Sequence, residues 1–153
     1  MTEIEQTKTL KKDEVEQLCG FRLADGFYGV PVLGVQEVIK AQKVTPIPLA
    51  PKCIKGLINL RGQIVTAVSL RILFGIAEEG NLDHMNIIVR SGDSLYALEV
   101  DEILDVMDLE LKNFEERPDT LREGLKKFII GAYKLNKKLL IKIDLQKILK
   151  LEE

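Results

Sequence analysis

The sequence predicts an all-β protein built from two small barrels. Most apolar stretches of the 153-residue chain are short, and they alternate with the period of two that is typical of strands. Turn signals containing Gly, Asn or Asp separate these stretches. The whole plan then repeats once along the chain, with short helical pieces between the strand pairs. These three observations predict the fold class.

The predicted strands place alternate residues on one face. A strand beginning near Gln63 carries such a face, and two later stretches have the same pattern. The residues of these faces are Ile64, Thr66, Val68 and Leu70; Tyr96, Leu98 and Val100; and Leu139, Ile141 and Ile143. The turns that bound the strands lie at residues 24–26, 61–63, 91–93 and 136–138.

Few segments have the spacing of a helix. Val35, Val38 and Ile39 predict one short amphipathic helix, and the apolar residues of 145–149 predict another. Serine or aspartate precedes two such pieces, at Ser69 and Asp144, and we expect both side chains to cap the helix that follows.

An internal duplication connects the two halves of the chain. Tyr28–Val38 aligns with Tyr96–Val106 at one constant offset, and Gly56–Leu60 aligns with Gly131–Leu135 at a second, slightly larger offset. Each half therefore has two hairpin-like strand pairs, each followed by a short helical piece. Closure of each half into a small barrel would remove exposed strand edges.

The duplication predicts the domain boundaries. Residues 15–82 form the first barrel subdomain and residues 83–150 the second. Residues 1–14 precede the repeat, and they are either flexible or add a strand to the second subdomain.

Several motifs resemble the CheW family of chemotaxis proteins. They are Gly34–Val38, Thr45–Pro48, the G-x-I-N-L-R-G-x-I run of Gly56–Ile64, and Val68–Arg71. The resemblance extends from about Val15 to Leu149 and is weaker in the second half. Family members often have Pro-x-x-Asp where this chain has Thr66 and Ser69, but serine caps a helix as well as aspartate does.

The resemblance implies two tandem five-stranded SH3-like barrels, in agreement with the duplication. It also implies a non-catalytic adaptor that binds the regulatory domain of a CheA-type histidine kinase. The cytoplasmic tip of a chemoreceptor would bind in the groove between the barrels. The protein would then be cytoplasmic, recruited to membrane-associated receptor arrays, and monomeric when free.

Arg61 is the leading site residue, because it matches the arginine implicated in receptor coupling in that family. From composition alone, an arginine at a turn is more often only solvated. Gly62 permits positive φ at the turn, and we expect Glu37 to orient the Arg61 guanidinium. Val35 and Val38 either face the core or receive an apolar residue of a receptor helix. The expected receptor-coupling residues are Val35, Glu37, Val38, Gly56, Asn59, Arg61 and Gly62.

Charge is segregated in the second half, although the whole chain has a net charge of only −2. The stretch Glu99–Asp119 sums to −7 and the stretch Lys126–Lys150 sums to +7. A lysine-rich hairpin suggests nucleic-acid binding as an alternative function. Aromatic stacking partners are scarce there, so we favour mutual neutralisation and protection of a strand edge by lysine.

The sequence has no recognisable catalytic, cofactor or metal motif. His84 is the only histidine and lies in a polar loop, where a solvated side chain is expected. Cys19 and Cys53 have apolar neighbours and are expected to be reduced and buried. The N-terminus resembles neither a signal peptide nor a membrane helix.

Overall fold

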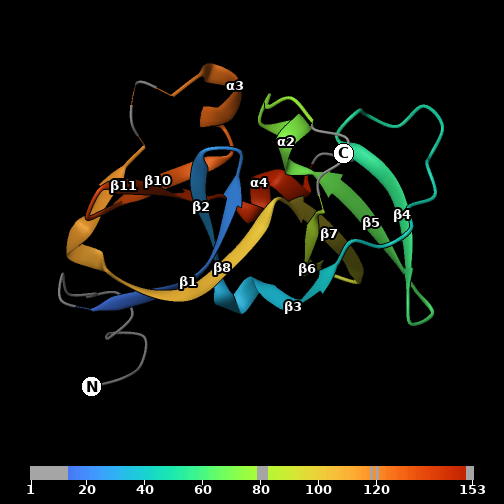
Figure 1. Cartoon of the computed structure of the whole chain (residues 1–153), viewed down its shortest axis with the longest axis horizontal. Helices are drawn as coiled ribbons and strands as arrows, with labels where there is room; N and C mark the ends of the chain where they lie inside the picture. Colours follow the sequence, from blue (N-terminus) through green and yellow to red (C-terminus); the bar gives the residue numbers. More distant parts are fainter. Residues whose placement is uncertain (1–13, 79–82, 118, 120, 151–153) are drawn as a thin grey trace.

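The computed structural model describes residues 14–78, 83–117, 119 and 121–150. It is mostly β, with two sheets and a few short helices, which confirms the predicted fold class. In Figure 1 the six-stranded sheet occupies the left of the molecule and the five-stranded sheet the right, with a short red helix between them.

The six-stranded sheet, called barrel A below, has the strand order β8-β1-β2-β11-β10-β9. One strand more than predicted belongs to it, because the short β9 pairs with β10. Its members are β1 (Val15–Leu23), β2 (Gly26–Pro31), β8 (Glu102–Glu110), β9 (Phe114–Glu116), β10 (Ile129–Leu135) and β11 (Lys138–Ile143).

The five-stranded sheet, called barrel B below, has the order β3-β6-β7-β5-β4. Its members are β3 (Val35–Lys40), β4 (Ile54–Leu60), β5 (Gln63–Ser69), β6 (Met85–Ser91) and β7 (Ser94–Val100). The helical elements are the 3-10 turns η1 (Val32–Gly34) and η2 (Leu111–Asn113), and the helices α2 (Leu70–Leu73), α3 (Glu123–Lys126) and α4 (Leu145–Leu149).

The repeat seen in the sequence is present in the strand pairing. Strand β5 runs parallel to β7, and β11 runs parallel to β2. In these two ladders Thr66 pairs with Tyr96, and Ile141 pairs with Tyr28. The alignment of the repeats makes Thr66 equivalent to Ile141 and Tyr96 equivalent to Tyr28, so the two barrels are built alike.

Each barrel nevertheless takes strands from both repeats. Hairpin β1–β2 of the first repeat completes barrel A, and hairpin β6–β7 of the second repeat completes barrel B. The predicted subdomains 15–82 and 83–150 thus follow the repeats, whereas the barrels exchange hairpins. The exchange arises because very short connections, η1 after β2 and Asp101 after β7, carry the chain directly from one sheet into the other.

The exchanged hairpins also form the main core. Residues of β1 and β2 pack with residues of β6 and β7 between the barrels, including Phe21, Tyr28, Leu98 and Val100, all at most 5% exposed. Each barrel has a smaller interior of its own. The relative placement of the two barrels therefore rests on the largest buried apolar cluster, since apolar burial is the dominant favourable term in folding.

One predicted helix is wrong and the other is confirmed. Residues 35–39 lie in strand β3, whose β-branched side chains pair with β6, and only the turn η1 precedes it. Leu145–Leu149 is helical, as predicted. Both predicted caps are also present: Ser69 Oγ accepts from Ile72 N and Asp144 Oδ1 accepts from Lys147 N, each at 3.2 Å.

Two further expectations concern the N-terminal segment and the two cysteines. The predicted N-terminal segment 1–14 lies outside the described residues except for Glu14, whose carbonyl accepts a hydrogen bond from Leu111 N at 2.9 Å. Cys19 and Cys53 are free and buried, as predicted. Among the described helices, none has the length and apolar character needed to cross a membrane.

Candidate functional site

The site begins at the two-residue turn between β4 and β5. Arg61 and Gly62 both have positive φ, at 51° and 87°, as a tight hairpin turn of this kind requires. The side chain of Asn59 holds the turn, because its Oδ1 accepts from Gly62 N at 2.9 Å. The turn therefore presents the Arg61 side chain, which is 66% exposed, from a fixed backbone.

Glu37 pairs with Arg61 through a hydrogen-bonded ion pair. Glu37 lies on β3, at one edge of the five-stranded sheet, and Arg61 follows β4 at the other edge. The pair thus links the two edge strands, β3 and β4, at the place where the five-stranded sheet closes into barrel B. Because Arg61 is largely exposed, the pair stabilises the fold by only about 0–1 kcal/mol, and its main effect is to orient the guanidinium.

Val35 and Val38 lie on the same face of β3 despite their odd spacing. A register shift between Val35 and Glu37 inserts an extra residue, so that Val35 pairs with Val89 and Val38 with Ile87. Val35 packs against the core between the barrels, whereas Val38 is 37% exposed. Of the two valines, Val38 is the one available to a partner.

Gly56 has a structural role. It is buried in β4 with φ of 145°, and a Cβ at this position would lie 2.1 Å from the carbonyl oxygen of Thr45. Only glycine permits this close approach of two backbones. Gly56 therefore supports the hairpin that carries Arg61 and does not itself reach the surface.

Ile64 belongs to this surface, although it was not among the expected receptor-coupling residues. It is 62% exposed on β5 and pairs in register with Asn59. Its repeat partner Leu139 and the repeat partner of Val38, Val106, are also exposed, at 36% and 55%. The sequence signal for an exposed Ile64 was its place two positions after the turn glycine Gly62. The alternating pattern showed only that Ile64 lies on one face of a strand.

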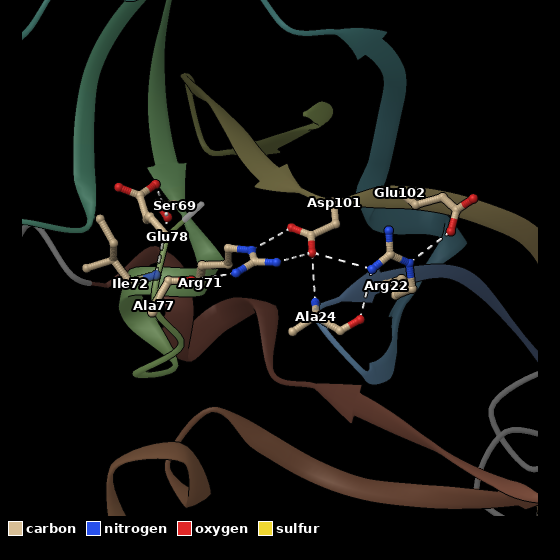
Figure 2. Close-up of polar contacts among 9 residues, drawn as sticks. All are labelled: Arg22, Ala24, Ser69, Arg71, Ile72, Ala77, Glu78, Asp101 and Glu102. Carbon is tan, nitrogen blue, oxygen red and sulfur yellow. Dashed lines mark hydrogen bonds and ion pairs between the residues drawn. The ribbon is translucent and has the colours of Figure 1, made fainter. Parts of the chain in front are cut away.

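A second charged cluster lies between the barrels and is mostly buried (Figure 2). Arg71 on α2 donates to both carboxylate oxygens of Asp101, from Nε at 2.7 Å and from Nη2 at 2.6 Å. The backbone N–H of Ala24 donates to Asp101 at 2.7 Å, and Arg22 lies 3.6 Å from the same carboxylate and 2.9 Å from Glu102. Groups from both barrels therefore meet at Asp101.

Burial alone would raise the pKa of Asp101. Hydrogen bonds from Arg71 and from the N–H of Ala24 lower the pKa, and so do the positive charges of Arg71 and Arg22. The net result is a pKa below the usual aspartate value. Asp101 is therefore a carboxylate, and the cluster is a fixed joint with its charges matched.

The favoured neutralisation between the acidic and basic stretches of the second half is seen in Lys134 with Glu115, whereas two other lysines contact residues of β1 and β2. Lys134 pairs with Glu115 at 3.1 Å, Lys142 pairs with Glu16, and Lys138 lies 4.1 Å from the centre of the Phe27 ring. Strands β10 and β11 lie inside the sheet, so the expected protection of an edge by lysine is wrong.

The described residues contain no group of three or more His, Cys, Asp or Glu side chains arranged to hold a metal ion. His84 is half-buried rather than fully solvated. The site built by β3, β4 and β5 has an oriented guanidinium beside exposed apolar side chains, which suits the binding of a protein partner.

Comparison with known proteins gives one consistent result. A family model described as a CheW-like domain matches residues 17–153. The chain is 30% identical to a chemotaxis protein CheW of Helicobacter pylori over 145 residues, covering 94% of this chain and 87% of the relative. It is 32% identical to a chemotaxis protein CheW of Klebsiella aerogenes over 136 residues, covering 87% and 81%.

A solved structure agrees. The crystal structure of a scaffolding protein, TtCheW from Thermoanaerobacter tengcongensis, superimposes with a TM-score of 0.76 at 32% identity, covering 85% of this chain and 89% of that one. These matches give the nucleic-acid alternative no support.

Proposed function

The chain belongs to the family of CheW-like domains and is a non-enzymatic chemotaxis scaffold, and we propose that it couples chemoreceptors to a CheA-type histidine kinase. In this proposal the protein is cytoplasmic, monomeric when free, and recruited to membrane-associated receptor arrays. The receptor binds at the surface built around Arg61, and the regulatory domain of the kinase binds elsewhere on the two barrels.

The oriented arginine is the observation that supports the receptor site. Arg61 is exposed on a rigid turn and is held by Glu37 from the opposite edge of the sheet. Val38 on β3 and Ile64 on β5 are exposed apolar side chains near this turn. A receptor helix with one apolar face and a nearby polar group would complement such a surface, since helices dock by apolar anchors at helical spacing.

The remaining expected site residues support the surface in different ways. Asn59 and Gly62 fix the turn, and Gly56 allows the close approach of β4 to Thr45. Val35 anchors β3 to the core between the barrels. In the proposed complex the receptor contacts Arg61, Glu37 and Val38. The other four expected residues keep this surface in its conformation.

The test is kinase autophosphorylation in the presence of receptor fragments, with the wild-type protein, Arg61→Ala or no added protein. We expect receptor-dependent control to require the protein and receptor affinity to fall about tenfold or more in Arg61→Ala, as for a central interface arginine. The matched control is Lys137→Ala, at the tip of the equivalent turn between β10 and β11, which should behave as wild type.

Exchange of the charged pair tests the role of Glu37. The double variant Arg61→Glu, Glu37→Arg should bind receptor better than either single variant, because the ion pair is restored. A double variant no better than the single ones would contradict the restored ion pair as a determinant of receptor binding. Absence of any effect of the wild-type protein on the kinase would overturn the adaptor function itself.

A further inference from the structure

Two buried oxygens at one end of barrel B have no hydrogen-bond partner within the part of the chain that the structure describes. They are Oδ1 of Asn86 and Oε1 of Glu99, whose residues are 1% and 7% exposed. Buried acceptors without a donor are destabilising, and a buried ionised carboxylate is more so. A donor must therefore be supplied, or the carboxylate must be neutral.

The two side chains lie next to each other on neighbouring strands. Asn86 of β6 is the register partner of Glu99 of β7, so both project from the same face of the sheet. The next pair on that face, Ile88 and Ala97, belongs to the interior of barrel B. Asn86 Nδ2 donates to the carbonyl of Lys40 at 3.4 Å, which leaves Oδ1 as the atom that needs a donor.

The duplication provides an internal comparison. The alignment of Tyr28 with Tyr96 makes Leu18 and Pro31 the positions in barrel A that correspond to Asn86 and Glu99. Leu18 is fully buried and lies in the interior of barrel A. The fold itself therefore does not require polar side chains at these positions, and barrel B has acquired a pair of them.

Charged and polar groups of the neighbouring elements face Glu99. Burial raises its pKa, the neighbouring His84 and Lys55 lower it, Glu78 raises it, and the net shift is upward. Lys55 is itself paired with Glu78 at 2.9 Å. Ser69, the parallel neighbour of Glu99 on β5, donates its hydroxyl to Glu78 at 3.3 Å.

We propose that Glu99 is a carboxylic acid in the folded protein and donates its proton to Oδ1 of Asn86, so that one proton satisfies both buried oxygens. This proton lies near the C-terminal end of strand β3, because Asn86 also donates a hydrogen bond to the carbonyl of Lys40, the last residue of that strand. Barrel B, and with it the strand that carries Glu37, is then stabilised by a proton that is lost as the pH rises.

The sign of the effect follows from the raised pKa. The unfolded chain loses its proton at the usual glutamate value of about 4.3, while the folded protein keeps it to higher pH. Between these two pKa values the folded state binds more protons, so the stability of the wild-type protein falls as the pH rises and becomes flat above the folded pKa.

The experiment combines carboxyl NMR titration of Glu99 with urea unfolding across that pH range. Glu99→Gln should abolish the fall in urea midpoint, because its amide is a permanent donor to Asn86. Glu116→Gln, an exposed control on β9, should keep the fall. If Glu99→Gln folds poorly, the double variant Asn86→Leu, Glu99→Leu makes both positions apolar, with the leucine of barrel A at position 86, and should fold without the pH dependence.

Two results would overturn the proposal. One is a Glu99 carboxyl that titrates at or below the usual glutamate value, which would mean that an ionised carboxylate is satisfied by other donors such as water. The other is a pH dependence of the urea midpoint that is the same in Glu99→Gln and Glu116→Gln.

Discussion

Arg71 and Asp101 form a bidentate, hydrogen-bonded ion pair at the place where the chain leaves one barrel and enters the other. Their side chains are 8% and 3% exposed. The repeat-equivalent positions are Gln146 and Leu33, so the duplication has no second copy of this joint. The pair therefore fixes the two barrels at one side of their common core only.

Removal of one partner of this pair should be strongly destabilising. Asp101→Asn removes the bidentate ion pair of the buried Arg71 guanidinium, and loss of one partner of a buried pair costs about 3–5 kcal/mol. Urea unfolding with linear extrapolation measures this directly. Glu102→Gln is the matched control, because it removes the more exposed partner of Arg22 and should cost about 0–1 kcal/mol. Equal losses in the two variants would contradict the special role of Asp101.

The same pair predicts sensitivity to acid. The pKa of Asp101 is lowered in the folded protein, so its stabilising effect is present above the usual aspartate value of about 3.9 and is lost as the pH falls through the folded pKa. Urea midpoints measured from neutral to strongly acidic pH should fall less steeply in Asp101→Asn than in wild type. Parallel curves would show that other carboxylates dominate acid unfolding.

Three glycines should respond differently to alanine. Gly56→Ala should be the most destabilising, because the added Cβ would lie 2.1 Å from the Thr45 carbonyl oxygen. Gly62→Ala has open space around it and costs only the left-handed backbone strain of about 1–2 kcal/mol. Gly124→Ala, in helix α3 with open space, should be neutral or stabilising by up to about 1 kcal/mol. Thermal or urea unfolding that reverses this order would contradict the geometry at Gly56.

Much of the fold could be predicted because the chain contains two copies of one plan. The two constant offsets of the alignment located the equivalent strands, and the caps at Ser69 and Asp144 followed from their places before equivalent helices. The ion pair between Glu37 and Arg61 was also expected, and it is present. Agreement between independent local signals is typical of a sequence that specifies one structure.

The errors have physical causes. The β-bulge between Val35 and Glu37 places Val35 and Val38 on one face, which imitates the three-residue spacing of a helix. Alternation shows which residues form a strand but not which strand it pairs with, so the exchange of hairpins between the barrels was not predicted. Burial of Glu99 and Asp101 was not predicted either, because their partners come from distant parts of the chain.

The exchange of hairpins predicts that neither repeat folds alone. A fragment ending at residue 82 would lack β6 and β7, which stand between β3 and β5 in barrel B, and a fragment starting at residue 83 would lack β1 and β2, which stand between β8 and β11 in barrel A. Both fragments would also expose the apolar faces that form the core between the barrels. We therefore expect residues 1–82 and 83–153 to be unfolded separately, by circular dichroism and by the dispersion of amide NMR signals.

Mixing the two fragments should restore the native spectrum, because every strand pair is then available again and the cut lies outside both sheets. The wild-type chain cleaved between the same two repeats is the matched control and should stay folded. A well-dispersed spectrum from residues 83–153 alone would show that β8, β10 and β11 close without β1 and β2. The second repeat would then be an independent folding unit, and the exchange of hairpins between the barrels would not be needed for folding.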